Sequence, residues 1–248
     1  MPRLDWLIER PVAHRGLHDA QKGIIENTPS AFAAAIAGGY GIECDLQITA
    51  DGEAMVHHDE ALGRLTDGSG RLDAMSAADL ERVPFKATSD RMITLGELCD
   101  LVAGRTPLVI ELKSRFDGDR RLAARAAELL ARYRGPAAVM SFDPAQVAAL
   151  REIAPALLRG MVAERRYRHR EWDALPAASK RAMAYFKHVL RTRPQFLAYS
   201  VKDLPALIPL AARNLFGLPL LTWTVRSPED RETAARWADQ MIFEGFRP

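Results

Sequence analysis

The chain has 248 residues, of which 48% are hydrophobic and 27% are charged, a composition typical of a folded domain rather than a disordered chain. Its formal net charge is only +2, so overall charge gives no support for a nucleic-acid or membrane partner. The two cysteines, Cys44 and Cys99, imply no disulfide framework.

The N-terminal stretch Met1–Pro11 mixes charged and apolar residues and lacks the uninterrupted apolar core of a signal peptide. No window reaches about 18 uncharged apolar residues, the length that a transmembrane helix needs. We therefore expect no transmembrane segment and a soluble, cytoplasmic protein.

Short apolar runs alternate with longer amphipathic stretches, which is typical of a βα architecture with a mostly parallel sheet. The predicted strands, in chain order, cover residues 12–13, 41–48, 54–57, 108–112, 137–141, 157–162, 196–200, 220–225 and 240–243. One predicted helix, residues 29–38, begins after Thr28 at Pro29. Another, residues 120–134, is rich in Ala and Leu. Nine strands are one more than an eight-stranded barrel needs, so at least one must be an addition.

The join between the second and third predicted strands is the exception to this pattern. Between Ile48 and Ala54 there is no room for a parallel crossover, which needs about a dozen residues. Asp51-Gly52 is a tight-turn signal, so we predict an antiparallel hairpin. If these two residues form the loop, the resulting strand register places Asp45 opposite His58.

Three carboxylates lie in or at the ends of apolar runs. Glu43 and Asp45 are two residues apart in a strand, so their side chains leave the same face of the sheet. Like charges this close repel unless a cation lies between them, and oxygen ligands suit Mg²⁺ or Ca²⁺. A surface strand explains this pair equally well. Glu111, which ends a separate apolar strand and shares its face with Lys113, favours the metal site.

Histidines follow the first and third predicted strands. Phosphodiester cleavage needs one group to take a proton from the nucleophile and another to protonate the leaving alcohol, and imidazole titrates near neutral pH. His14 is one candidate, and either His57 or His58 is the other, because only one of these neighbours can point into the site. Alternation alone does not choose between them. Together with the carboxylates, these histidines indicate a phosphodiester-cleaving enzyme.

Cationic and amide side chains complete the candidate site. Arg15 can bind a phosphate through two hydrogen bonds, and Lys113 can supply a point charge to it. Asn27 either donates to phosphate or caps the helix that follows it.

Two further segments are polar or basic. Residues 59–94 are loop-like, and we expect them to form a loop-rich insertion that rims the site. A basic cluster could attract an anionic substrate or a membrane surface, although a solvated helix face or loop is the better explanation. Its members are Arg165, Arg166, Arg168 and Arg170.

A set of short motifs occurs in one order along almost the whole chain: His14-Arg15-Gly16, Glu26-Asn27-Thr28, Glu43-x-Asp45, Thr49-x-Asp51-Gly52, His58-Asp59, Leu62-x-Arg64-x-Thr66, Glu111-x-Lys113, Ser141-Phe142 and Trp223-Thr224-Val225. Together they resemble the glycerophosphodiester phosphodiesterase family. Single members such as Ser141-Phe142 carry little information, whereas the ordered set from His14 to Lys113 is highly specific.

The resemblance implies a single domain over residues 1–248, an α/β TIM (β/α)8 barrel of the phospholipase-C-like type. The implied reaction is metal-dependent hydrolysis of a small-molecule glycerophosphodiester to glycerol 3-phosphate and an alcohol. The implied ligands of one Mg²⁺ or Ca²⁺ ion are Glu43, Asp45 and Glu111. The implied general acid and base are His14 and His58, which sets His57 aside. The implied substrate contacts, chiefly to phosphate, are Arg15, Asn27, Lys113 and Trp223.

The C-terminal segment 241–248 departs from the family pattern, which usually carries a Thr-Asp pair after the last strand. This departure leaves the accepted alcohol open. A lysophospholipase D-like activity on acylated substrates would need an apolar entrance. Aromatic residues that could provide one, although such residues more often complete the core, are Phe85, Trp172, Phe186, Phe196, Phe216 and Phe246. A catalytically silent barrel that binds a phosphorylated metabolite is a weaker alternative, because every required histidine and carboxylate is present.

Overall fold

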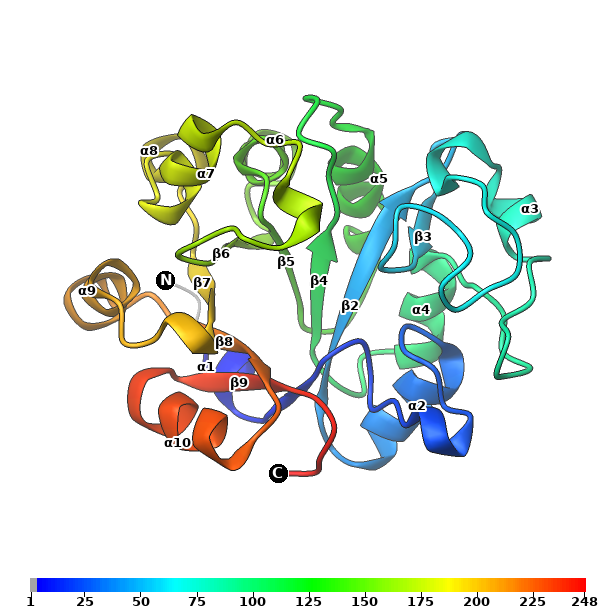
Figure 1. Ribbon diagram of the computed structural model, residues 1–248, viewed down its shortest axis with the longest axis horizontal. Helices are drawn as coiled ribbons and strands as arrows, with labels where there is room; N and C mark the ends of the chain where they lie inside the picture. Colours follow the sequence, from blue (N-terminus) through cyan, green and yellow to red (C-terminus); the bar gives the residue numbers. More distant parts are fainter. Residues whose placement is uncertain (1–3) are drawn as a thin grey trace.

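Eight parallel strands close into a barrel in the computed structural model, which describes residues 4–248 (Figure 1). β1 pairs with both β2 and β9, and this double pairing closes the ring. In barrel order the strands are β1 (Val12–Ala13), β2 (Gly41–Ile48), β4 (Leu108–Leu112), β5 (Ala137–Ser141), β6 (Leu158–Ala163), β7 (Phe196–Ser200), β8 (Leu220–Val225) and β9 (Gln240–Phe243). The predicted TIM-barrel fold is confirmed.

Helices surround the barrel in the ribbon view (Figure 1). They are α1 (Asp5–Ile8), α2 (Pro29–Ala37), α3 (Ala77–Leu80), α4 (Leu95–Val102), α5 (Arg121–Leu130), α6 (Pro144–Ile153), α7 (Ala177–Ala184), α8 (Val189–Thr192), α9 (Leu207–Phe216) and α10 (Pro228–Trp237). Single 3₁₀ turns cover Ala20–Lys22, Leu72–Ala74, Arg170–Trp172 and Val201–Asp203. Within residues 4–248 no helix combines the length and the apolar character needed to cross a bilayer.

Alternating side chains on the strands divide the apolar core into two layers. Ile42, Cys44 and Ile110 pack outward in a cluster with Phe32 of α2 and other helix residues. Val109 and Phe196 belong instead to a cluster inside the barrel, which Leu7 of α1 joins. This interior packing fills the barrel, so that polar chemistry is confined to the carboxyl ends of the strands.

The hairpin prediction is confirmed, but its register is wrong by one residue. β3 (Ala54–Val56) is antiparallel to β2, with Leu46 opposite Val56 and Ile48 opposite Ala54. The loop has three residues rather than two, because Gly52 adopts a left-handed conformation with φ of 83° and the Thr49 amide donates to Glu53 O at 3.0 Å. Asp45 therefore faces His57, not His58, across the hairpin.

The segment 59–94 lies between β3 and α4 and has a small apolar core of its own. Leu72, Leu80 and Phe85 are buried there together with Met55 of β3. The basic cluster lies in the segment between β6 and α7, where Arg165, Arg166 and Arg168 are exposed, whereas the side chain of Arg170 falls outside the described residues.

Substitution of Gly160 tests the packing inside the barrel. An added Cβ at Gly160 would lie 2.4 Å from the ring of Phe196 on the neighbouring strand, so we expect Gly160→Ala to lower the free energy of unfolding by about 1–3 kcal/mol. Gly96 in α4 is a matched control, because its added Cβ would meet only ordinary contacts at 3.7 Å and alanine favours a helix. In urea unfolding, the free energy of unfolding of Gly96→Ala should therefore equal or exceed that of wild type. An equal decrease of this free energy in both variants would contradict the packing described for Gly160.

Candidate active site

Three buried carboxylates meet at the carboxyl ends of β2 and β4. Glu43 and Asp45 point into the barrel from β2, and strand pairing places Glu111 of β4 beside Asp45. Each is 8% exposed or less, and one ligand atom from each lies within 4.8 Å of the others. Three ionised groups at this spacing repel strongly, so the cluster requires positive charge to hold it together.

Lys113 supplies part of that charge. Its Nζ lies 2.8 Å from Asp45 Oδ1 and 2.7 Å from Glu111 Oε1. Burial alone would raise the pKa of Asp45, but the charge of Lys113 holds it well below its usual range. Burial, with the nearby charges of Asp45 and Glu111, raises the pKa of Glu43 well above its usual range. An all-oxygen set that is still short of positive charge is chemically suited to a hard divalent cation.

Arg15 and Asn27 hold the carboxylates from the side of β1. The Arg15 amide donates to Glu43 Oε2 at 2.9 Å, and its Nε lies 3.3 Å from Asp45 Oδ2. Asn27 Nδ2 donates to Asp45 Oδ2 at 2.9 Å. Both residues have φ of 56°, a left-handed backbone that asparagine tolerates better than arginine does. This backbone conformation accompanies the contacts of the Arg15 amide with Glu43 and of the Asn27 side chain with Asp45.

Asn27 does not cap α2, which was one of the two roles that the sequence left open for it. The side chain of Thr28 caps α2 by accepting from the Ala31 amide, and Asn27 is only 1% exposed. Asn27 is also not among the residues that line the cavity beside the cluster. Its phosphate contact stays a prediction, and its observed contact is with Asp45.

His14 is fixed by a carboxylate that the sequence motifs did not point to. His14 Nδ1 lies 2.6 Å from Oε2 of Glu244, the residue after β9, and Glu244 is also paired with Arg226. Although burial opposes it, these two hydrogen-bonded partners hold the pKa of Glu244 well below its usual range. Burial lowers the pKa of His14 to about 4, so the ring is neutral at neutral pH. With Nδ1 donating to an ionised carboxylate, Nε2 is left as a base, 3.9 Å from Glu43 Oε2.

His58 is held in the same manner by a different network. Its Nδ1 lies 2.8 Å from Asp59 Oδ1, and Arg64 Nε donates to Asp59 Oδ2 at 2.6 Å. Arg64 Nη2 also donates to Glu26 at 2.6 Å, and Glu26 accepts from Arg15 Nη1 at 2.7 Å. A continuous chain of hydrogen bonds therefore links the guanidinium of Arg15 to the imidazole of His58.

One cavity of about 250 Å³ brings most of the predicted site residues together. Those that line it are His14, Arg15, Glu43, His58, Glu111, Lys113 and Trp223. Its remaining wall includes Phe142 of the β5 end and Arg226. His57 is buried instead beside Phe85, with ring centroids 6.4 Å apart, and does not line this cavity. The two histidines and two of the three carboxylates, Glu43 and Glu111, thus share one cavity, whereas Asp45 lies behind its lining.

The aromatic entrance that the acylated-substrate alternative would need is not formed by its six candidate residues. Of its six candidates, Phe85, Phe186 and Phe196 are buried in apolar clusters, Phe216 is exposed on α9, and Phe246 packs against Phe243. Only Trp172 of the six lines a cavity next to the site. The acylated-substrate alternative therefore loses the feature that would have favoured it.

Comparison with known proteins gives the family. The model of the glycerophosphoryl diester phosphodiesterase family matches residues 14–246. The chain belongs to this family. As a glycerophosphodiester phosphodiesterase family member it is an enzyme, a phosphoric diester hydrolase.

Individual relatives agree over most of their length. The glycerophosphodiester phosphodiesterase of Caldanaerobacter subterraneus is 28% identical over 231 residues, which cover 89% of this chain and 87% of that protein. An Oleispira antarctica phosphodiesterase solved with the product sn-glycerol-3-phosphate aligns with a TM-score of 0.76, at 19% identity over 94% of this chain and 91% of that one. The glycerophosphodiester phosphodiesterase of Thermotoga maritima aligns with a TM-score of 0.69, at 23% identity over 94% of each chain. These two structures share the barrel fold.

Sequence reasoning missed the partners of the two histidines. Asp59 and Arg64 were already visible as motif members, and the hydrogen-bonding needs of a fixed imidazole could have assigned Asp59. Glu244 lies 230 residues from His14, in the segment that departs from the family pattern, so only barrel closure brings the two together. Although this C-terminal segment departs from the family pattern, it still places a carboxylate, that of Glu244, beside His14.

The raised pKa of Glu43 predicts a pH-dependent instability of the metal-free protein. A carboxyl whose pKa is higher in the folded state stabilises the fold at low pH, and that contribution is lost as pH rises through the folded pKa. Glu43→Gln stays uncharged, so its melting temperature, measured in chelator, should rise relative to wild type by a few degrees as pH increases from about 4 toward neutrality. The exposed control Glu232→Gln should show no such trend, and a pH-independent difference for Glu43→Gln would refute this electrostatic account.

Proposed function

We propose that the enzyme hydrolyses glycerophosphodiesters to glycerol 3-phosphate and an alcohol by histidine acid–base catalysis at a single divalent-cation site. The observation that carries this proposal is the placement of two histidines, each held at Nδ1 by a carboxylate, in one cavity with Glu43 and Glu111 of the acidic cluster. The Oleispira relative, whose structure holds sn-glycerol-3-phosphate, supports the identity of the product.

The acidic cluster is the proposed cation site, with Glu43, Asp45 and Glu111 as ligands. The fit is one of donor chemistry, since three buried carboxylate oxygens lie within 4.8 Å and remain short of positive charge. When bound, Mg²⁺ or Ca²⁺ would orient the attacking hydroxyl and neutralise the negative charge that develops at the phosphoryl group. Asn27 serves this site by holding Asp45 through two hydrogen bonds.

Arg15 and Lys113 are the proposed phosphate contacts. Both line the cavity, and the pKa values of both are raised by carboxylates, so both remain charged. The planar guanidinium of Arg15 is paired with Glu26 through one of its nitrogens. The ammonium group of Lys113 is paired with Glu111 of β4. Trp223 also lines the cavity and gives it an apolar wall, with its ring against Phe142 at a centroid distance of 5.5 Å.

The hydrogen-bond partners of the two histidines suggest their roles. In the route we propose, the glycerol hydroxyl next to the phosphate attacks phosphorus, His14 Nε2 accepts the hydroxyl proton, and a cyclic phosphate forms. A protonated His58 donates its Nε2 proton to the leaving alcohol oxygen. Water then opens the ring as His58 accepts a proton from that water and His14 returns its proton to the glycerol oxygen. Glu244 and Asp59 hold the two rings throughout.

Product release from a panel of glycerophosphodiesters tests the reaction. Glycerol 3-phosphate should appear with Mg²⁺ or Ca²⁺ and not with chelator, and His14→Ala and Glu43→Ala should each lower kcat by at least about 100-fold. Glu232→Gln on α10 is the control for exposed carboxylates and should retain wild-type activity. Robust turnover in chelator, or in either site variant, would show that the site is elsewhere.

Glu244→Gln tests the positioning of His14. Loss of the carboxylate charge weakens the hold on the Nδ1 proton and on the imidazolium that forms, so kcat should fall about 10–100-fold. Cation affinity, measured by calorimetry, should stay at the wild-type value because Glu244 is not in the acidic cluster. The matched control is Glu229→Gln, an exposed carboxylate on α10. Unchanged kcat in Glu244→Gln would remove this residue from the mechanism.

A further inference from the structure

Large apolar side chains are exposed on one side of the barrel. Among the residues that the structure describes, seven such side chains are at least 46% exposed, and all seven lie between residues 153 and 216. This part of the chain holds the end of α6 and the whole of α7, α8 and α9, which follow one another around the barrel (Figure 1). Single exposed apolar residues are ordinary, but their gathering in one region marks an interaction surface.

Five of the seven lie near the amino ends of the barrel strands. Ile153 ends α6, before β6, and Val189 and Leu190 belong to α8, which precedes β7. Leu215 and Phe216 end α9, before β8. Because β6, β7 and β8 pair in parallel, their amino ends lie at one edge of the sheet. These five residues, the amino-end patch, are therefore at the opposite end of the barrel from the acidic cluster.

Hydrogen bonds hold the backbone that carries this patch. Arg151 Nη1 of α6 donates to the carbonyl oxygens of Leu190 and Arg191 at 3.2 and 2.8 Å, which ties α6 to α8. The Leu197 amide in β7 donates to Pro219 O, just before β8, at 2.9 Å. The segments that precede β7 and β8 are thus adjacent, and the apolar side chains are exposed on a fixed backbone.

The surface around the patch carries positive charge with little to neutralise it. Residues 174–228 contain eight Lys and Arg residues and one acidic residue, Asp203. Lys187, Arg191 and Arg193 are exposed, and none of them forms an ion pair within the described part of the chain. Their charge is therefore available to an anionic partner.

A buried arginine adds to this charge. Arg159 of β6 is 8% exposed and donates only to the neutral oxygens of Pro155, Thr192 and Gln195, at 3.1 to 3.3 Å. Burial, together with the like charges of neighbouring arginines, lowers the pKa of Arg159. Glu152 lies nearby, but it is paired with Arg120. Arginines are thus crowded at this end of the barrel without matching carboxylates.

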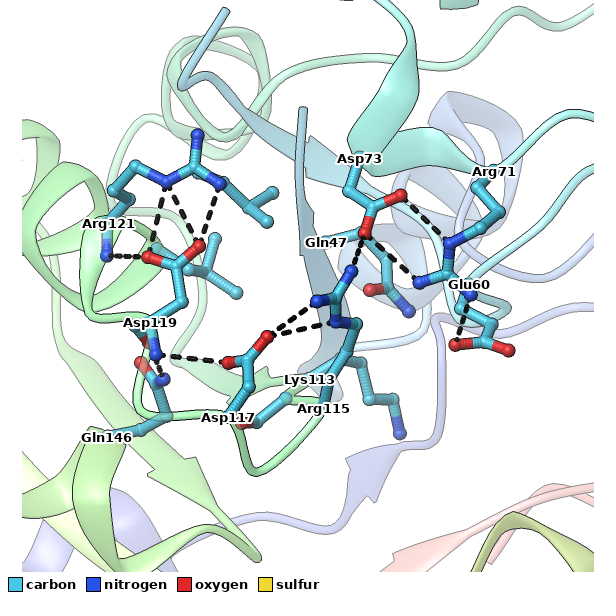
Figure 2. A pocket seen from close by; sticks show the side chains of 13 residues that line it. Gln47, Glu60, Arg71, Asp73, Lys113, Arg115, Asp117, Asp119, Arg121 and Gln146 are labelled. Atoms are coloured by element: carbon cyan, nitrogen blue, oxygen red, sulfur yellow. Dashed lines mark hydrogen bonds and ion pairs between the residues drawn. The ribbon is translucent and has the colours of Figure 1, made fainter. Parts of the chain in front are cut away.

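Arginines at the other end of the barrel are compensated. Figure 2 shows Arg115 between Asp73 and Asp117, and Arg121 beside Asp119. The excess of positive charge is therefore a local property of the amino end, which the small net charge of the whole chain conceals.

We propose that the amino-end patch and the arginines around it dock the enzyme on an anionic phospholipid bilayer. Leu190 and Phe216, 84% and 74% exposed, enter the boundary between headgroups and acyl chains, while Arg191 and Arg193 meet the lipid phosphates. A nucleic acid would match the charge but leave the apolar side chains without a partner. A second copy of the chain would bring like charges together. The catalytic cavity opens at the opposite end and stays in water.

Flotation with lipid vesicles, in chelator and without substrate, tests the docking. Wild type should bind vesicles of phosphatidylcholine with about one third phosphatidylserine at least about tenfold more tightly than pure phosphatidylcholine, and high salt should reduce the difference. Excess glycerol 3-phosphate should not displace the protein, because the catalytic cavity is not involved. Equal binding to both vesicles, or displacement by glycerol 3-phosphate, would overturn the proposal. No turnover is measured, so the result is independent of the proposed function.

Two double variants assign the binding to the patch and its arginines. Arg191→Gln with Arg193→Gln should weaken binding to the anionic vesicles about 25-fold, at about fivefold for each basic residue. Leu190→Gln with Phe216→Gln should weaken it at least about tenfold, because the inserted apolar surface is lost. All four side chains are exposed, so the fold should not change.

Arg82→Gln with Arg121→Gln is the matched control for the loss of two charges. Both arginines have exposed side chains, both are paired with aspartates, and both lie away from the amino-end patch. This variant should bind the anionic vesicles as wild type does. A loss equal to that of Arg191→Gln with Arg193→Gln would show that only total charge matters, and it would contradict a defined docking surface.

The apolar variant separates the remaining occupants. If Leu190→Gln with Phe216→Gln binds anionic vesicles as wild type does, the surface is a site for any polyanion, RNA included, and bilayer docking is wrong. If sedimentation velocity shows a wild-type dimer that this variant converts to a monomer, the patch is a contact between copies of the chain, which also overturns the proposal.

Discussion

The mutual repulsion of three buried carboxylates is the constraint on which the rest of the site depends. Glu43, Asp45 and Glu111 meet where β2 and β4 end, and Lys113 and Arg15 offset only part of their charge. Asparagine, arginine and lysine side chains are arranged around Asp45, so its ionised form is well solvated by protein groups. Glu43 has only Arg15 to compensate it, through the Arg15 amide and charge, so burial and the neighbouring carboxylates raise its pKa.

Rigid elements hold the two histidines of the candidate site, and carboxylates fix the orientation of their rings. Each histidine follows a strand or a hairpin, and each donates from Nδ1 to a neighbouring acid, Glu244 or Asp59. The same arrangement leaves Nε2 of both rings available to the cavity. The packed interior below them, built around Val109 and Phe196, keeps this chemistry at one end of the barrel.

The surroundings of the reaction centre differ between its two sides. On the side of His14 and Arg15, His14 is hydrogen-bonded to Glu244 after β9, and Arg15 is paired with Glu26 in the loop before α2. The side of His58 opens into a larger space bounded by Trp172 and the loops after β4 and β5. This asymmetry gives the two sides of the candidate site different surroundings.

The sequence by itself determined the strands and the hairpin, and it predicted most of the residues that the structure brings together at the carboxyl ends of the strands, because strand periodicity and the short motifs are local properties of the chain. It did not determine the hairpin register, since a left-handed Gly52 and a three-residue loop are set by backbone geometry that the turn signal Asp51-Gly52 does not specify. It also did not decide whether Asn27 contacts phosphate or caps α2. In the structure Thr28 caps α2, and Asn27 contacts Asp45. The pairing of His14 with Glu244 was decided only by the tertiary structure, because closure of β1 against β9 joins residues from opposite ends of the chain.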